Sequence, residues 1–518
     1  MTSPTKPSHK PSKKEPPKKA VDAPNNDAHN PLSDKAKNNE KFFQKVYSFV
    51  EDQIMMTRNK SGTVYATFGS ERGFETLPLT CTRMSSKIKR MIRDEFEFRA
   101  PKHMIAELVE ELQDTAQDIS LEVYEVHHRV ARGIKGQIFL DLHDENNRVL
   151  EVDRDGYRHH DSDDELPLFL RTPGMTALPD PVGVTGNIEL LRNLLNYGSE
   201  SNWYLIIVFI LYSLRPLGPY TILVVSGTAG SSKSTFSRIL RLLIDPSSVP
   251  TQALPRSVAD LMITASNSHL LVFDNVRTLS LDLSDALCQL ATGGGVRKRT
   301  LYTDNAETLI HVTKPCILNG IDDVASQPDL VSRCILMELP AITTRRTEEE
   351  LNSKLAASIS AIFAGLMTAL SKTLAELDNV TEFPDARMAD FARFGVAVER
   401  ALGWPTNCFK EAFSQNQQQQ MTNSLGDDPL AAAIRTLVHT ELEVDTTYTK
   451  TPTDLLAALR DVATHRQLSN RAWPMSSLSL GKRLRKMEPA LRACGVGIKF
   501  HHSGNRAISV KRLDNFRR

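Results

Sequence analysis

Apolar residues in the middle of this chain form short, nearly continuous runs that are separated by polar turns. This is the pattern of buried parallel strands that alternate with helices. The clearest run is Thr221–Val225, which is rich in β-branched residues, and others are 269–273, 316–318 and 334–339. We therefore expect an α/β protein built around a parallel sheet.

Helical patterns separate and follow these runs. The expected helices are 235–243, 257–266, 328–333, 348–377 and 388–402, and a short extended piece is expected at 251–254. The most apolar stretch, 204–214, is much shorter than the roughly 20 residues that a membrane-spanning helix needs. It predicts a buried helix, and we expect no membrane association.

The flanking regions follow other patterns. In the first third, a half-buried strand is expected at 62–68, helices at 86–98 and 101–119, and strands at 121–132, 137–142 and 148–152. Asp141 and Asp144 lie at a strand end, where they are either turn residues or part of a metal site of the polymerase type. The last ninety residues predict helices at 429–441, 453–464 and 476–494, followed by two strands around Ser503-Gly504-Asn505, which is the order of a winged helix.

Composition adds limits to this picture. The chain has 518 residues, a formal net charge of +1 and six widely spaced cysteines, which is typical of reduced intracellular thiols. We expect a cytoplasmic protein. The expected divisions are a disordered Lys/Pro-rich tail (1–40), an α+β domain of unclear role (41–194), a core that contains the parallel sheet (195–345), a helical lid with a Gln-rich linker at 415–420 (346–428) and a winged-helix domain (429–518).

The strand at 221–225 leads into a glycine-containing loop and then a helix, which is the arrangement of a phosphate cradle. Lys233 would reach the β- and γ-phosphates, and the Ser234 hydroxyl would bind Mg²⁺. Ser232 stands where the usual pattern has its last glycine. The expected nucleotide-binding residues are Gly227, Thr228, Ala229, Gly230, Ser231, Ser232, Lys233, Ser234 and Thr235.

Polar residues follow the later strands at matching places. Asp274 ends an apolar strand and is expected to hold Mg²⁺, while the next residue, Asn275, can orient a water but cannot take its proton. Asn319, at the end of the following strand, would help to place that water. Arg333 is expected to act as an arginine finger on the nucleotide of a neighbouring subunit, or else to pair with a surface carboxylate.

Basic residues gather in two places. Arg297, Lys298 and Arg299 lie at the base of a predicted hairpin, with Asp304-Asn305 as its turn. Lys482, Arg483, Arg485 and Lys486 lie in the candidate recognition helix of the winged helix. Clustered positive charge of this kind is expected to contact DNA phosphates, although a solvated basic face is the alternative.

The order of the loop at 227–234, Asp274-Asn275, the hairpin, Asn319 and Arg333 resembles the AAA+-like ATPases of helicase superfamily 3. Within them the chain resembles the helicase part of phage and plasmid primase-helicases, and its phrases GSSKST, FDNV, LATGGG, LYTD and ILNGIDDV are similar to prophage-encoded ATP-binding proteins. The resemblance covers about 195–518 and is poor before residue 190.

This resemblance implies that 195–345 is a P-loop ATPase core and that the protein is an ATP-dependent DNA helicase or translocase of a mobile element in a bacterial or phage-infected cell. It would use ATP and Mg²⁺ and form a ring, a hexamer by family resemblance, on single-stranded or origin DNA. Ser232 and Asn275 depart from the superfamily pattern, which bears on the rate of hydrolysis. Two alternatives stay open. One is a DNA-binding protein that ATP switches without translocation, and the other is a primase-helicase with a primase-like N-terminal domain.

Overall fold

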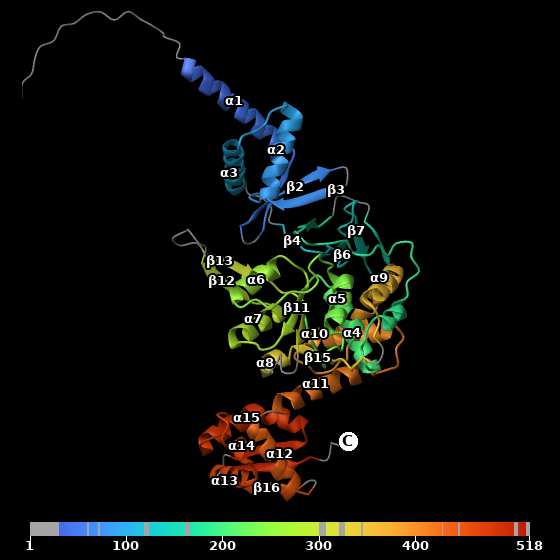
Figure 1. The fold of residues 1–518 in the computed structure, drawn as a ribbon, viewed down its shortest axis with the longest axis vertical. Helices are drawn as coiled ribbons and strands as arrows, with labels where there is room; N and C mark the ends of the chain where they lie inside the picture. The colour runs from blue at the N-terminus through green and yellow to red at the C-terminus, as the bar shows by residue number, and fades with distance from the viewer. Residues whose placement is uncertain are drawn as a thin grey trace, which may run out of the picture.

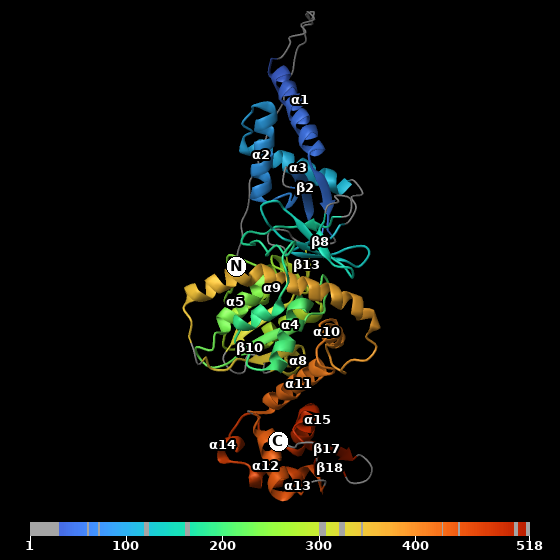
Figure 2. The same ribbon diagram turned by 90° about the vertical axis from the view of Figure 1, so that its right-hand side faces the viewer.

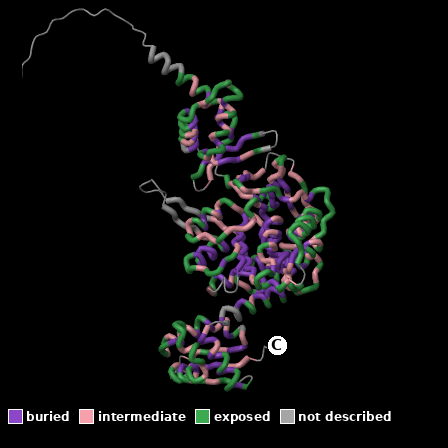
Figure 3. Tube along the Cα trace, in the orientation of Figure 1, coloured by how far each residue is buried: buried purple, intermediate pink, exposed green. Residues whose placement is uncertain are grey.

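The computed structural model describes residues 31–59, 62–70, 73–118, 124–160, 166–299, 307–320, 327–342, 345–426, 428–443, 446–501 and 506–513. In Figure 1 an N-terminal α+β region lies above a second small sheet, and the central α/β core lies below both. Helix α11 (Cys408–Gly426) connects this core to the C-terminal region. Buried residues are concentrated in the central core (Figure 3).

The core contains a four-stranded parallel sheet, and each of its strands was expected from the sequence. Its strands are β10 (Ile222–Ser226), β11 (Leu271–Val276), β14 (Cys316–Gly320) and β15 (Cys334–Glu338). They lie in the order β11-β14-β10-β15, so β14 separates the two strands β10 and β11 that precede it in sequence. The extended piece expected at 251–254 is present as a single bridge from Gln252 to Phe273.

Helices cover both faces of this sheet. Leu223 and Val225 point toward one face, whereas Ile222 and Val224 point toward the other, because successive side chains in a strand alternate. The first face packs against α4 (Glu200–Ser213), α5 (Lys233–Ile244), α9 (Glu348–Glu376) and α10 (Ala389–Ala401). The second packs against α6 (Val258–Ser266), α7 (Leu281–Thr292) and α8 (Pro328–Val331).

Helix α9 crosses the width of the core in Figure 2. By length and composition, the segment Glu348–Asn379 is apolar enough to cross a membrane. However, Phe363, Leu366 and Leu370 are fully buried against the rest of the core. This packing is that of a core helix.

The Gln-rich tract expected to be a linker lies in α11, which does connect the core to the C-terminal region, but the tract is helical and bonded to the core. Asn416 accepts a hydrogen bond from the Leu336 N–H (3.0 Å) and donates to the Leu336 carbonyl (2.5 Å). Gln420, one turn later, donates to the Cys334 carbonyl (2.7 Å). The amide side chains thus take the place of a neighbouring strand along β15, an edge that would otherwise leave backbone groups unpaired.

The N-terminal region combines three helices with an antiparallel sheet of order β1-β2-β3. Its elements are α1 (Pro31–Asp52), β1 (Met55–Arg58), β2 (Val64–Ser70), β3 (Gly73–Pro78), α2 (Thr82–Phe96) and α3 (Lys102–Asp118). The disordered tail was predicted to extend to residue 40, but residues 31–40 form the first half of α1. That helix is anchored later, where Val46 and Val50 are buried. Residues 1–30 lie outside the described residues.

A second antiparallel sheet, of order β5-β6-β7-β8, follows, and a two-stranded parallel pair lies beside it. The strands are β4 (Val126–His127), β5 (Val130–Arg132), β6 (Ile138–Asp141), β7 (Val149–Val152), β8 (Tyr157–His159) and β9 (Leu168–Phe169). Asp141 is buried and pairs with Arg171 (2.6 Å), while Asp144 accepts from the backbone N–H of Arg148 (2.9 Å). Both carboxylates therefore have structural partners, as the turn interpretation expected.

A buried ion pair joins this second sheet region to the core. Arg129 Nε donates to Asp245 at 3.1 Å, and both side chains are almost fully buried. Burial alone would raise the pKa of Asp245, but the charges of Arg129 and His269 and hydrogen bonds lower it to about 2. His269 donates through Nε2 to the Ser213 carbonyl (2.7 Å), and burial, with the charge of Lys314, lowers its pKa to about 4.

Because His269 is buried in its neutral form at this junction, we expect the protein to lose stability in weak acid. His269 has an ordinary pKa of 6.5 when unfolded and about 4 when folded, so between these values the unfolded chain binds more protons. The contribution of neutral His269 to the free energy of unfolding is therefore fully present above pH 6.5. The free energy of unfolding falls by about 3 kcal/mol as the pH drops to 4. Denaturant unfolding at several pH values should show a smaller fall for His269→Gln. The exposed control His465→Gln should show the same fall in the free energy of unfolding with pH as the unchanged protein. An equal fall in all three proteins would contradict the prediction.

The C-terminal region has the expected three helices and two-stranded end, with additions. Its elements are α12 (Pro429–Glu441), β16 (Thr447–Lys450), α13 (Pro452–Val462), α14 (His465–Leu468), α15 (Ser477–Ala493), β17 (Val496–His501) and β18 (Ala507–Arg512). The sequence pattern missed β16 and α14. Strand β16 pairs with β18 to give the order β16-β18-β17. The turn expected at 503–505 lies outside the described residues.

Candidate active site

The loop between β10 and α5 has an unusual backbone. Gly227 and Gly230 have φ angles of 137° and 82°, in the region that favours glycine. A Cβ atom on Gly227 would lie 2.6 Å from the Leu339 carbonyl oxygen, so only glycine fits there. Ser232 also has a positive φ, of 67°, and its side chain makes no capping hydrogen bond to α5. The loop is therefore curled immediately before the helix.

The start of α5 presents positive charge to this loop. Lys233 is its first residue, and its Nζ donates to the carbonyls of Gly227 (2.6 Å) and Thr228 (3.0 Å). The first N–H groups of a helix have no intrahelical acceptor and carry the positive end of the helix dipole. The Ser231 hydroxyl is buried and has no hydrogen-bond partner among the described residues. A curled backbone, free helix N–H groups and a lysine together fit an anionic phosphate group.

Ser232 gives a test of the loop backbone. A non-glycine residue in the left-handed region costs about 1–2 kcal/mol, and this serine gains no capping bond in return. We expect Ser232→Gly to raise the free energy of unfolding by up to about 1 kcal/mol, because the relieved strain exceeds the added entropy of the unfolded chain. Ser232→Val should lower it. Denaturant titration of both variants measures the effect, and a destabilised Ser232→Gly protein would show that the backbone differs from this conformation.

Asp274 and Asn319 meet at the ends of neighbouring strands. Asn319 Nδ2 donates to Asp274 Oδ1 (3.3 Å) and to the Lys233 carbonyl (3.5 Å). Its Oδ1 accepts from the Ser237 hydroxyl on α5 (2.6 Å). Because carboxyl ends of parallel strands share one edge of a sheet, Asp274 lies beside the start of α5. The fold thus brings Lys233, Asp274 and Asn319 together, although they are far apart in sequence.

The two asparagines differ in their surroundings. Asn319 is fully buried, and its amide is occupied by three hydrogen bonds, so in this structure it positions the Asp274 carboxylate and not an exposed water. Asn275 is exposed, has a left-handed φ of 55° and donates its N–H to Asp274 Oδ1 (2.9 Å). Of the two amides, that of Asn275 is the one open to solvent.

Arg333 lies away from the loop of its own chain. Its carbonyl accepts from the Ile222 N–H at the beginning of β10, whereas the loop follows the other end of that strand. The side chain is buried and pairs with Asp329 at 2.7 Å, on the preceding helix α8. The hydrogen bond and charge of Arg333 lower the pKa of Asp329. Any role of Arg333 at a nucleotide therefore requires a neighbouring subunit.

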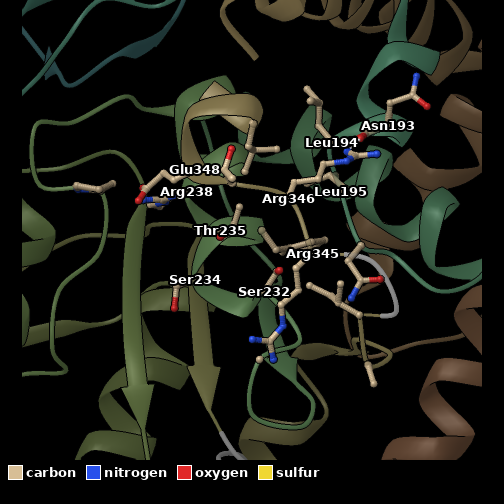
Figure 4. A pocket seen from close by; sticks show the side chains of 18 of the residues that line it. Asn193, Leu194, Leu195, Ser232, Ser234, Thr235, Arg238, Arg345, Arg346 and Glu348 are labelled. Carbon is tan, nitrogen blue, oxygen red and sulfur yellow. Dashed lines mark hydrogen bonds and ion pairs between the residues drawn. The ribbon is translucent and has the colours of Figure 1, made fainter. Parts of the chain in front are cut away.

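A cavity of about 990 Å³ adjoins the loop (Figure 4). Its walls come from the loop and α5, from the segment after β15, and from η1 (Ile188–Asn193) and the residues that follow it. Asn196 joins two of these walls, because its Nδ2 donates to the carbonyls of Ser231 (3.1 Å) and Pro340 (2.8 Å). The cavity is lined by Arg192, Asn193, Leu194, Leu195, Asn196, Gly230, Ser232, Ser234, Thr235, Phe236, Arg238, Pro250, Thr251, Ala341, Ile342, Arg345, Arg346, Thr347, Glu348 and Leu351.

Sequence reasoning missed Asn196, Arg345 and Arg346. The adjacent arginines stand immediately before Thr347, which caps α9 by accepting from the Glu350 N–H. The sequence feature that could have identified these arginines is a pair of basic residues beside the start of a helix, soon after the last core strand.

The expected DNA-contacting residues lie in two places outside this cavity. Arg297, Lys298 and Arg299 are in β12 (Gly295–Arg299), which pairs with β13 (Glu307–His311) in the predicted hairpin at one side of the core (Figure 1). The turn expected at 304–305 lies outside the described residues.

On α15, Lys482, Arg485 and Lys486 are exposed, and Arg485 lies over the Phe500 ring, 4.8 Å from its centroid. Arg483 instead pairs with Asp428, the residue that caps α12. Its charge is therefore partly committed within the C-terminal region.

Two models of one protein family match this chain. The model described as actinomycete integrative conjugative element replication protein matches residues 188–413, and that of the AICE RepA C-terminal domain matches residues 430–517. The chain is similar to the replication proteins of these elements. The resemblance to mobile-element replication proteins, expected from the sequence, is thereby confirmed. The matches to these replication proteins include the loop, the cavity and the C-terminal region, and they begin after the two N-terminal sheets.

A search of curated proteins found no significant match. Among solved structures, one titled "SCCmec type IV Cch - active helicase" is 12% identical, with a TM-score of 0.45, over 89% of this chain and 93% of that chain. The NrS-1 C-terminal region is 10% identical, with a TM-score of 0.40, over 90% of this chain and 98% of that chain.

Proposed function

We propose that this chain is an ATP-hydrolysing motor that moves on DNA during replication of a mobile element. The observation that carries the proposal is the meeting of Lys233, Asp274 and Asn319 at one edge of the parallel sheet. A curled loop with a lysine, next to a strand-end carboxylate, is the arrangement that P-loop enzymes use for a nucleotide and its metal ion. The similarity to mobile-element replication proteins supports the biological setting.

Each residue has a role in this proposal. Residues 227–235 would cradle the phosphates, with Lys233 at the β- and γ-phosphates. The Ser234 hydroxyl and the Asp274 carboxylate would hold Mg²⁺, which neutralises charge on the phosphate oxygens when it is bound. Asn319 keeps Asp274 oriented, and the exposed amide of Asn275 would place the attacking water.

Asn275 also supports a second candidate function. An amide orients water but does not accept its proton, so hydrolysis would be slow if no other group took that proton. A slowly hydrolysing protein suits a switch that binds DNA in one nucleotide state without translocation. A motor should hydrolyse ATP faster on single-stranded DNA, whereas a switch should not.

The DNA contacts are part of the same proposal. The hairpin with Arg297, Lys298 and Arg299 would contact single-stranded DNA inside a homo-oligomeric ring, and a hexamer is expected by resemblance. The C-terminal region has the α-β-α-α-α-β-β order and β16-β18-β17 sheet order that support a winged helix. In that fold, α15 would carry Lys482, Arg485 and Lys486 to the DNA backbone.

Strand displacement on forked DNA tests the motor directly. We expect separation of the strands with ATP and Mg²⁺, none with a non-hydrolysable analogue, and an ATPase rate that single-stranded DNA increases. ATP binding without displacement or stimulation would favour the switch. Absence of ATP binding would reject both functions.

A further inference from the structure

Four arginines line the cavity beside the loop, and three of them have an acceptor within the chain. These pairs are Arg192 with Glu200 (2.6 Å), Arg238 with Glu348 (2.8 Å), and Arg346 with the Asn193 carbonyl (2.5 Å). Arg345 is the fourth, and among the described residues its guanidinium has neither an ion pair nor a hydrogen bond. Its charge is thus available to a ligand in the cavity.

Arg345 is also the arginine nearest to the bend of the loop. Its Nη2 lies 3.4 Å from the position that a Cβ atom on Gly230 would occupy. Figure 4 places Arg345 on the side of the cavity where Ser232 lies. A side chain at Gly230 would therefore occupy the space between the loop and the guanidinium.

The backbone of Arg345 is held by its neighbours. Arg346 bonds to the carbonyl of Asn193, the last residue of η1, and Glu348, in the first turn of α9, pairs with Arg238 on α5. Thr347 caps the same helix. These contacts hold the start of α9 against two walls of the cavity, and the guanidinium of Arg345 lies beside the loop at Gly230.

We infer that Arg345 binds the phosphate chain of the nucleotide from the same subunit, an inference that rests on the proposed nucleotide site. A guanidinium can donate two parallel hydrogen bonds to phosphate oxygens. Because Arg345 stands directly before α9, a bound di- or triphosphate joins the loop to the start of that helix. Arg333 is buried where β10 begins, at the opposite end of the strands from the loop, so it cannot make this contact within the same subunit.

The test compares Arg345→Gln and Arg345→Lys with Lys354→Gln, which removes the same charge from an exposed position of α9 outside the cavity. Affinities of the full chain for ATP, ADP and adenosine are measured by competition against a fluorescent nucleotide. Loss of a charged hydrogen bond should weaken ATP and ADP binding by about 10- to 100-fold in Arg345→Gln and leave adenosine unchanged. Arg345→Lys should recover part of the loss, because it restores the charge without the fork.

Lys354→Gln should leave the ratio of ATP to adenosine affinity as it is in the unchanged protein, because that side chain pairs with Glu350 on the surface of α9 and does not line the cavity. Arg345 is exposed, so thermal melting of each variant should match the unchanged protein. An unaltered ratio in Arg345→Gln would overturn the inference but leave the nucleotide site standing. If the unchanged protein binds neither ATP nor ADP, the proposed function fails, and this inference fails with it.

Discussion

Lys233→Ala is expected to abolish ATP binding and turnover, with a loss of at least about 10²- to 10³-fold in rate. Lys233 is the only cationic side chain within the loop 227–235. Its Nζ already lies between the carbonyls of Gly227 and Thr228, inside the curl where phosphate oxygens would enter. Nucleotide titration and a phosphate-release assay measure the two losses separately.

The matched control is Lys354→Ala. Lys354 is a half-exposed lysine of α9 that pairs with Glu350 at 2.7 Å, and such surface pairs contribute little to stability. We expect normal nucleotide binding and turnover in that variant. Unchanged nucleotide affinity in Lys233→Ala would defeat the assignment of the phosphate loop.

Arg333→Ala should bind ATP nearly normally but hydrolyse it about 10³-fold more slowly, if Arg333 acts across a subunit boundary. The position of Arg333 excludes action on its own loop, because it lies where β10 begins. Asp329→Ala removes the same ion pair but keeps the guanidinium, so it should retain hydrolysis. Equal losses in both variants would instead indicate a structural ion pair.

Mixing the Arg333→Ala and Lys233→Ala proteins further distinguishes a role of Arg333 across a subunit boundary from a structural role. A Lys233→Ala subunit still carries Arg333, and an Arg333→Ala subunit still has an intact phosphate loop. Some interfaces in a mixed oligomer would therefore be complete, and part of the ATPase activity that neither variant shows alone should return. No recovery under conditions that form oligomers would remove the role of Arg333 across subunits.

Local pattern predicted the core well. The strands around Val224, Phe273, Leu318 and Ile335 are apolar on both faces, and short runs of this kind, rich in β-branched residues and bounded by turns, are typical of buried parallel strands. Their polar ends then predicted the residues that meet at the sheet edge. The sequence did not reveal the strand order, because the insertion of β14 between β10 and β11 depends on tertiary packing.

The failures have a common physical cause. Residues 415–420 carry almost no apolar pattern, so they were interpreted as a linker, but their amides are paired with strand β15. The first half of α1 is polar, and its helical state follows from the buried residues that come later in the same helix. In both segments the stabilising contacts lie elsewhere in the chain.

In the candidate site too, local motifs were predicted, whereas features that depend on tertiary packing were not. Lys233 and Asp274 belong to local motifs and were predicted, whereas Arg345 comes to the loop only because α9 begins there. Asn319 was predicted at the correct place, but its burial and its three hydrogen bonds belong to the packed structure. Motif spacing therefore located the chemistry, and tertiary structure determined which polar groups remain accessible.

The covered edges of the central sheet limit how copies of this chain can assemble. At one edge the amides of α11 bond to β15, and at the other the Asp274 N–H donates to the Gln252 carbonyl while the Gln252 N–H donates to Val272. The outward-facing groups bonded here, on Cys334 and Leu336 at one edge and on Val272 and Asp274 at the other, already have partners, so another copy could extend the sheet at these positions only by breaking these bonds. Subunits of an oligomer must therefore meet through side chains, and changes of charge or size at those surfaces should alter assembly without unfolding the core.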